Sequence, residues 1–172
     1  MIEGKKISLR TAIPGDLDIL FQWENDPSVW QYGVEKGSVT KKKIKKFINE
    51  SQHDLYLENQ LRLLIERKPG KKPIGCIDLF DFDSGNRTAG VGILIGNEKE
   101  RKKGYATESL LLLSGHAFHI LGIKILTARV SSENKASMNL FLKCGFKVSE
   151  KKRKSLPGKT TAWEYLLQLN NS

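Results

Sequence analysis

The stretch that decides the fold is residues 93–108, ILIGNEKERKKGYATE. Its apolar start, 93–95, gives way to a charged turn that narrows to Arg-Lys-Lys-Gly-Tyr-Ala at 101–106 and then opens into the apolar run 110–113. This order predicts a strand, a basic loop and the start of a helix. The first N–H groups of a helix have no partner inside it, and the helix dipole is positive there. Because Gly104 allows close approach and three cations lie beside it, the stretch indicates a site for a diphosphate or a similar anion.

Hydrophobic patterning outside this stretch predicts a mixed α/β fold. Strands are expected at 7–10, 61–66, 74–82, 89–95, 124–130, 146–154 and 160–169, and helices between Pro14 and Pro27, at 41–51, from Gly104 to about 121 and from 131–134 to 144. Turn residues join the strands between 61 and 95 into an antiparallel meander, and a strand–helix–strand crossover follows. Residues 1–172 therefore predict one domain with a mostly antiparallel central sheet, flanking helices and a central crossover.

Length and cysteine usage exclude several classes of protein. The 172 residues suffice for one well-buried domain, and no apolar segment is long enough to span a membrane. The start, 1–6, lacks the order of charged, apolar and small residues found in a signal peptide. Cys76 and Cys144 have no CxxC spacing and the three histidines do not cluster with them, so neither a disulfide framework nor a zinc site is expected. These features predict a cytoplasmic protein with no membrane partner.

The formal net charge of +10 could indicate a nucleic-acid partner, a ribosome-associated substrate, an anionic cofactor or a solubilising surface. Much of the excess lies in two runs, 41–46 and 151–154. Neither run is interleaved with aromatic residues, as a base-stacking platform would be. A solubilising surface is therefore favoured for both, and nucleic acid is not expected as a partner.

The pattern Arg-x-x-Gly-x-Ala at 101–106 is neither a dinucleotide fingerprint nor a P-loop. It resembles the pyrophosphate loop of the GNAT acyltransferase superfamily, which reads Arg/Gln-x-x-Gly-x-Gly/Ala. Residues 134–146, NKASMNLFLKCGF, resemble the family's Asn-x-x-Ser helix that ends in Lys-x-Gly-Phe. Segments 7–10 and 23–27 look like the branch that contains ribosomal-protein N-terminal and spermidine N-acetyltransferases. The resemblance covers nearly the whole chain and implies the GNAT fold.

The resemblance also implies acetyl-CoA as co-substrate and no metal. The residues that match the family's contacts to this co-substrate are Ile93, Leu94, Ile95, Arg101, Lys102, Lys103, Gly104, Tyr105, Ala106 and Asn134. The three strand residues would pair with the pantetheine arm, and 101–106 would hold the pyrophosphate. Asn134 would hydrogen-bond the cofactor near that arm. A plain N-cap is an alternative use of this asparagine, and it could serve both roles.

Two proton-transfer groups that the family often carries are missing. The general-acid tyrosine on the last helix corresponds to Phe141, which has no proton to donate, and a glutamate early in the strand before the loop corresponds to Gly90. Water could protonate the thiolate, which is already a good leaving group. Tyr105, Tyr32 and Ser137 are alternative donors, and nothing in the sequence selects among them.

The acidic run 78–83 is where a base is expected. Strand alternation sends Asp78 to one face and Asp81 to the other, and Asp78 is the most central. Burial there would raise its pKa, as a base requires. Asp78 is therefore the candidate base, with a structural role as an equal alternative. Trp30 and Tyr32 are candidates for lining the substrate cleft, although covering the sheet is the commoner role for such residues.

Together these features predict an acetyl-CoA-dependent N-acetyltransferase. A primary amine would attack the thioester directly in a ternary complex. The acceptor stays open among a small amine, a polyamine and a protein N-terminus, and a homo-oligomer is compatible with the sequence. The alternative is a non-catalytic module of the GNAT fold that binds acyl-CoA.

Overall fold

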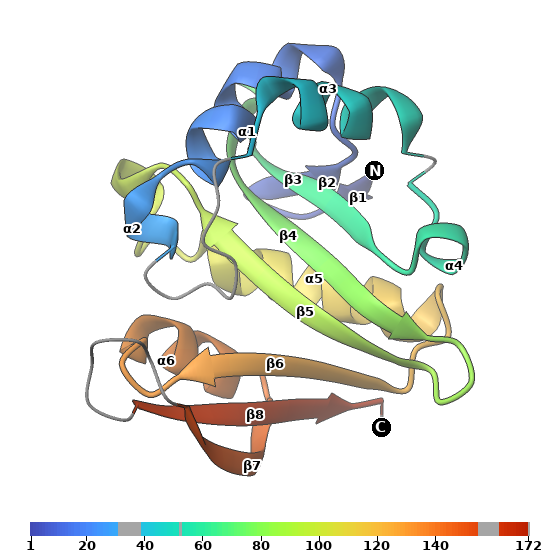
Figure 1. Ribbon diagram of the computed structural model, residues 1–172, viewed down its shortest axis with the longest axis vertical. Helices are drawn as coiled ribbons and strands as arrows, with labels where there is room; N and C mark the ends of the chain where they lie inside the picture. Colours follow the sequence, from blue (N-terminus) through green and yellow to red (C-terminus); the bar gives the residue numbers. More distant parts are fainter. Residues whose placement is uncertain (31–38, 52, 155–161, 172) are drawn as a thin grey trace.

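The computed structural model describes residues 1–30, 39–51, 53–154 and 162–171 (Figure 1). The strands are β1 (Ile2–Glu3), β2 (Ile7–Arg10), β3 (Leu61–Arg67), β4 (Lys72–Asp83), β5 (Thr88–Ile95), β6 (Ile125–Ser131), β7 (Lys147–Lys154) and β8 (Ala162–Asn170). The α-helices are α1 (Leu17–Glu24), α2 (Pro27–Trp30), α3 (Lys41–Glu50), α4 (Leu55–Glu58), α5 (Tyr105–His119) and α6 (Lys135–Lys143). Two short 3-10 helices are η1 (Pro14–Asp16) and η2 (Glu98–Glu100).

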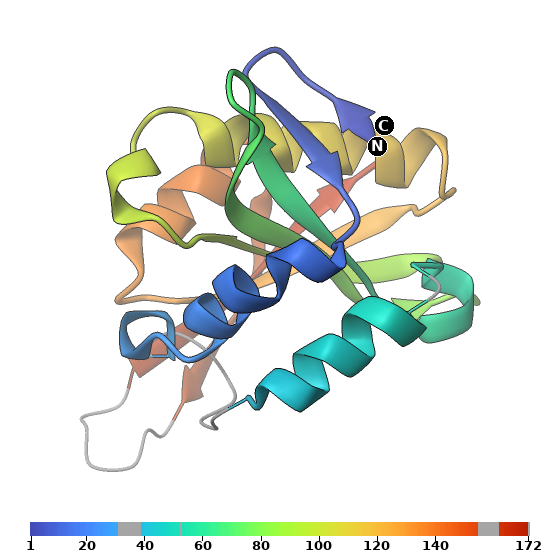
Figure 2. The same cartoon turned by 90° about the horizontal axis from the view of Figure 1, so that it is seen from above.

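The described strands form one sheet in the order β1-β2-β3-β4-β5-β6-β8-β7, with helices on both faces (Figure 2). α1 and α3 cover one face, where Ile44 of α3 and Leu64 of β3 belong to one buried cluster. α5 and α6 cover the other face, where Leu110 of α5 and Leu79 of β4 belong to a second cluster. Side chains alternate along a strand, and Leu79 points to the α5 face. Its neighbour Asp78 therefore lies on the α1 face of the sheet.

The sheet opens between β5 and β6. These strands are parallel and pair only over three residues each, Thr88–Gly90 against 125–127, whereas the other neighbouring strands are antiparallel. Beyond Gly90, β5 keeps β4 as its partner to Ile95 and diverges from β6, as Figure 1 shows. The diverging part is called the split below, and there no described strand lies beside one backbone edge of β5.

The mixed α/β fold and the crossover β5–α5–β6 are confirmed. The structure adds β1, α2 and α4, which are too short to show a hydrophobic period. It also starts β4 at Lys72 instead of residue 74, and Pro73 is accommodated where the β3–β4 register shifts. Among the described helices, none is both long and apolar enough to cross a membrane.

Candidate active site

A buried carboxylate holds the segment 96–104, called the anion loop below, in shape. Glu100 is 6% exposed and accepts hydrogen bonds from Lys103 Nζ at 2.9 Å and from Arg67 Nη1 at 3.0 Å. The hydrogen bond from Lys103 is the main cause that lowers the pKa of Glu100, and the charge of Arg67 lowers it further. Burial acts in the opposite direction. Glu100 therefore stays ionised at neutral pH and ties the loop to β3.

The loop ends on the exposed start of α5. Gly104 is the N-cap, with a left-handed φ of 85° that glycine adopts without a Cβ penalty. The helical ladder begins with Glu108 N–H donating to the Gly104 carbonyl at 3.1 Å. The N–H groups of residues 104–107 precede that bond and point out of the helix end, where the dipole is positive. This arrangement suits a bound anion, as the sequence predicts for Gly104, Tyr105 and Ala106.

The cations of the loop have different surroundings. Arg101 Nε donates to the Ile95 carbonyl at 3.1 Å, so this side chain joins the loop to the end of β5. Lys103 is bound to the buried carboxylate described above, whereas Lys102 is exposed and has a left-handed φ of 61°. Lys6 also reaches the loop, donating from Nζ to the Lys103 carbonyl at 3.4 Å. The sequence did not predict this cation, because it comes from the other end of the chain.

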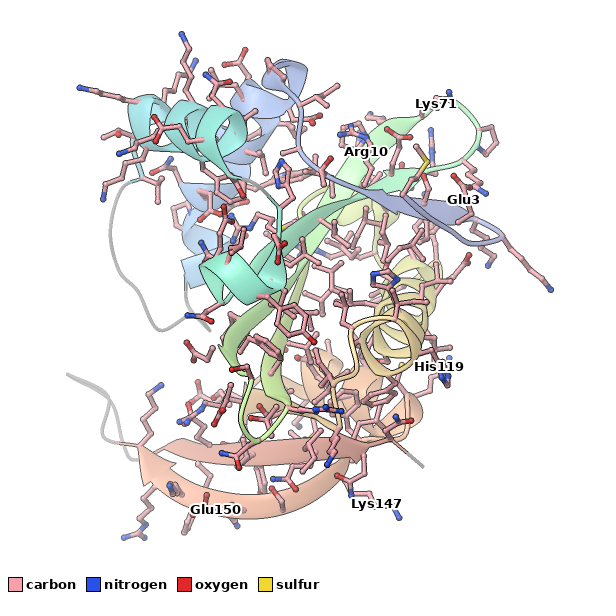
Figure 3. The ribbon with its side chains drawn as sticks, turned by 90° about the vertical axis from the view of Figure 1, so that its right-hand side faces the viewer. Glu3, Arg10, Lys71, His119, Lys147 and Glu150 are labelled. Atoms are coloured by element: carbon pink, nitrogen blue, oxygen red, sulfur yellow. The ribbon has the colours of Figure 1, made fainter. Side chains whose placement is uncertain are left out.

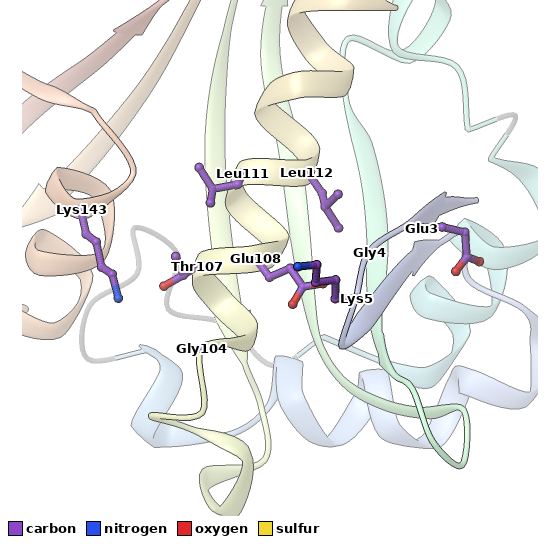
Figure 4. A pocket seen from close by; sticks show the side chains of 9 residues that line it. All are labelled: Glu3, Gly4, Lys5, Gly104, Thr107, Glu108, Leu111, Leu112 and Lys143. Carbon is purple, nitrogen blue, oxygen red and sulfur yellow. The ribbon is translucent and has the colours of Figure 1, made fainter.

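A groove of about 610 Å³ runs beside the loop and over the first turns of α5 (Figure 4). Its lining residues are Glu3, Gly4, Lys5, Gly104, Thr107, Glu108, Leu111, Leu112 and Lys143. In Figure 4, Lys143 of α6 and Thr107 lie on one side of the helix, and Lys5 lies with Glu108 on the other. The groove thus combines apolar side chains with ammonium groups on two sides. Lys143 belongs to the Lys-x-Gly-Phe end of the motif at 134–146, whereas no local motif marks Lys5. Only the packing of β1, α5 and α6 brings the two ammonium groups to this groove.

The predicted strand contacts lie along the split. Ile93 and Ile95 are partly buried against the cluster under α5, and Leu94 lies on the opposite face with the cluster under α1. Asn134 is the N-cap of α6, because its Oδ1 accepts from Ser137 N–H at 3.1 Å. The capping role is therefore present, and its role toward a cofactor stays a prediction.

Asp78 is one member of a three-residue ion cluster on the α1 face. Both carboxylate oxygens accept from Arg62, at 2.8 Å from Nε and at 3.0 Å from Nη2, and Arg62 Nη1 also bonds Glu24 at the end of α1. The Asp78 side chain is 24% exposed. Burial raises the pKa of its carboxyl, although the charge and hydrogen bonds of Arg62 act in the opposite direction. Asp78 thus makes structural contacts, and its role as base stays a prediction.

A phenylalanine ring fills the position of the family glutamate. A Cβ on Gly90 would lie 2.5 Å from Phe80 Cε2, and one on Gly92 would lie 3.5 Å from Cε1 of the same ring. Phe80 therefore packs flat against a strand that has no side chains at these two positions. Any larger residue at position 90 would displace the ring.

The position of the family tyrosine is a core position in this chain. Phe141 is 3% exposed and meets the Phe146 ring edge-to-face, with centroids 5.0 Å apart. Among the other predicted donors, Tyr105 is partly buried at the start of α5. The Trp30 side chain and Tyr32 lie outside the described residues. In the part of the chain that the structure describes, no group of three or more His, Cys, Asp or Glu side chains is placed to hold a metal ion.

Comparisons with known sequences agree with this geometry. Residues 6–147 match the family model of the acetyltransferase (GNAT) domain. The chain is also 30% identical, over 148 residues, to a Bacillus subtilis (strain 168) protein named uncharacterized N-acetyltransferase YoaA. That match covers 85% of this chain and 82% of the relative.

Solved structures show the same fold. A spermidine N-acetyltransferase from Vibrio cholerae, in complex with CoA and spermine, superposes with a TM-score of 0.85 at 20% identity, covering 97% of this chain and 96% of that one. A GNAT-family acetyltransferase from Bacillus anthracis gives 0.81 at 20% identity, covering 98% and 97%. A dodecameric form of the Vibrio enzyme gives 0.80 at 19% identity, covering 97% and 95%.

Proposed function

The chain belongs to the GNAT acetyltransferase family, and from this membership we propose that it transfers the acetyl group of acetyl-CoA to a primary amine. One observation carries the proposal: the split and the anion loop lie at the same end of β5. A strand edge that can pair with an extended arm thus leads directly to a helix start that can bind the phosphates of that arm.

The site has donors for each part of acetyl-CoA. The N–H groups of 104–107 and the exposed Lys102 ammonium would bind the diphosphate. The groove between Lys5 and Lys143 is large enough for the nucleotide, and its ammonium groups would bind the remaining phosphate. The free edge of Ile93–Ile95 would pair with the pantetheine arm, and Asn134 would donate to it.

Three tasks then fall to the chain during transfer. Asp78 takes the proton of the attacking amine, a task for which a carboxyl pKa raised by burial is suited. The N–H groups on the free edge of β5 stabilise the charge that develops on the thioester oxygen. The split positions the two substrates against each other. Because thiolate is a good leaving group, the chain needs no acid at Phe141.

The Phe141 and Gly90 positions also motivate a second candidate, a non-catalytic module that binds acyl-CoA. Release of free CoA thiol separates the two functions. The chain would be incubated with acetyl-CoA and a panel of small amines, polyamines and N-terminal peptides. The enzyme proposal predicts amine-dependent release with acetylated amine as product. Tight acetyl-CoA binding without release across the panel would identify the module instead.

A further inference from the structure

Asp78 and Arg129 lie on the same face of the sheet, on opposite sides of the split. Asp78 pairs with Gly92 of β5, and Gly90, two residues earlier, pairs with Thr127 of β6. Arg129 follows Thr127 by two residues, so it projects to the same face as Thr127 at the level where the strands diverge. Leu126, Ala128 and Val130, which alternate with these residues, are buried in the cluster under α5 and α6. Arg129 therefore lies on the α1 face, as Asp78 does.

The cofactor would reach this face through the split. The anion loop leads into α5, which covers the opposite face of the sheet (Figure 2). An arm that is anchored there and passes along β5 through the split delivers its thioester toward the face that carries Asp78. The acceptor would then approach between β4, which carries Asp78, and β6, which carries Arg129.

Arg129 keeps much of its charge available. Its side chain is 67% exposed, and its contact with Glu164 is a distant one of 3.8 Å. Glu164 is closer to another cation, because Lys154 Nζ donates to it at 3.0 Å. Lys152 lies 3.3 Å from Glu150 on the same face. Among the described residues of this patch, three cations thus accompany two carboxylates, and the wall opposite Asp78 is positive.

We propose that the acceptor is an amine that also carries an anionic group, a carboxylate or a phosphate, and that Arg129 binds this group. The inference rests on the proposed function, because it takes the amine end to lie at Asp78. Where β5 and β6 still pair, two strand spacings, roughly 10 Å, would separate the backbones of β4 and β6. Asp78 and Arg129 lie beyond that pairing, where the strands have diverged, so the amine and the anion are several bonds apart. A polyamine of that length would instead place a second ammonium against Arg129, which is repulsive.

Three amines with the same five-carbon chain test this directly: δ-aminovalerate, pentylamine and cadaverine, whose far ends are anionic, neutral and cationic. The expected order of kcat/KM is δ-aminovalerate first, pentylamine about tenfold lower and cadaverine lowest. An aminoalkyl phosphate of matched length then shows whether a carboxylate or a phosphate is preferred. Equal rates across the three amines, or preference for cadaverine, would overturn the proposal.

Arg129→Gln should lower kcat/KM for δ-aminovalerate to about the value for pentylamine, while Arg129→Lys should keep part of the advantage. Lys147→Gln is the matched control, because it removes one exposed charge at the far end of β7 (Figure 3).

Calorimetry of the CoA-loaded protein with each amine gives a readout without turnover. Binding of δ-aminovalerate that depends on Arg129, without thiol release, would support this inference and contradict the proposed function. Binding equal to that of pentylamine would contradict the inference.

Discussion

At Asp78, burial and the Arg62 guanidinium act on one carboxyl in opposite directions. Burial raises its pKa, and the cation lowers it. A base needs both effects, because it must be ionised when the amine arrives and must still bind a proton well. Sequence alternation predicted that Asp78 and Leu79 lie on opposite faces, and it failed only beyond the register shift after Phe80, where Phe82 joins Leu79 in the cluster under α5. It did not predict Arg62, because a cross-strand partner depends on the register between β3 and β4.

Asp78→Asn should lower kcat/KM for every amine by about 10² to 10⁴, the usual contribution of a general base, and leave CoA affinity unchanged. In the wild type, activity is lost as pH falls through the raised pKa of Asp78, above the ordinary aspartate value of ~3.9. Asp81→Asn is the control, because Asp81 is exposed in the same strand with a left-handed φ of 48° that asparagine tolerates. Full activity of Asp78→Asn would assign Asp78 a structural role alone.

Gly90 and Phe80 should be coupled energetically. Gly90→Glu forces its Cβ into the Phe80 ring, and overpacking of this kind costs about 1–3 kcal/mol of unfolding free energy. Phe80→Ala removes the obstacle, so the double variant should be more stable than the sum of the single changes by about 1 kcal/mol. Urea unfolding of the four proteins measures this. If the losses in unfolding free energy of the two single variants add up in the double variant, the Phe80 ring is not what excludes a larger residue at position 90.

Glu100 should make stability depend on pH. Its pKa is lowered in the folded chain, chiefly by the hydrogen bond from Lys103, so the ionised form stabilises the fold. That contribution is complete above the ordinary glutamate pKa of ~4.3 and is lost as pH falls through the lowered value. The difference in unfolding free energy between wild type and Glu100→Gln should therefore be constant near neutral pH and shrink in acid. A difference in unfolding free energy that stays the same at every pH would contradict this role.

Among the elements, the order strand, basic loop and helix start was predictable from residues 93–108. The charge and the glycine that define it are adjacent in sequence, and a left-handed Gly104 at the helix start follows from local chemistry. Lys6 and Lys143 join the same region from elements far away in the chain. The motif at 134–146 includes Lys143, but no residue pattern places Lys143 or Lys6 beside the loop, so this neighbourhood could only be seen in the structure.

The hairpin β7–β8 shows the same limit. The run 151–154 has no aromatic residue between its cations, and the sequence therefore predicted a plain charged surface. In the structure, Lys151 Nζ lies 4.2 Å from the centre of the Trp163 ring and 5.5 Å from that of Tyr165. These rings come from the neighbouring strand. Cations and aromatic rings therefore alternate across the two strands, although they do not alternate along the sequence.

A substitution in the anion loop should leave the stability of the fold almost unchanged and weaken CoA binding. Lys102→Glu reverses an exposed charge beside the start of α5 and should weaken CoA binding by roughly tenfold, about 1.4 kcal/mol. The melting temperature without ligand should stay close to that of the wild type, since an exposed surface residue contributes little. Lys147→Glu on β7 makes the same charge change at a distance. Calorimetry that finds equal CoA affinity for both variants would contradict the assignment of the loop.

For the whole molecule, the two faces of the sheet divide the work. The loop, the groove and α5 would hold the cofactor on one face, while Asp78 and Arg129 would meet the acceptor on the other. The split between β5 and β6 is the passage that connects them. This division explains why the family motifs identify the donor so well. Under the proposed function these motifs would lie on the cofactor side, and the residues that would choose the acceptor lie on elements outside those motifs.

The most direct test of this account is an experimental structure of the chain with CoA bound. We expect the diphosphate on the N–H groups of 104–107, the nucleotide in the groove between Lys5 and Lys143, and the pantetheine arm in the split beside Ile93–Ile95, with its thiol toward the face that carries Asp78. CoA bound elsewhere, or an arm that leaves the split empty, would contradict the account.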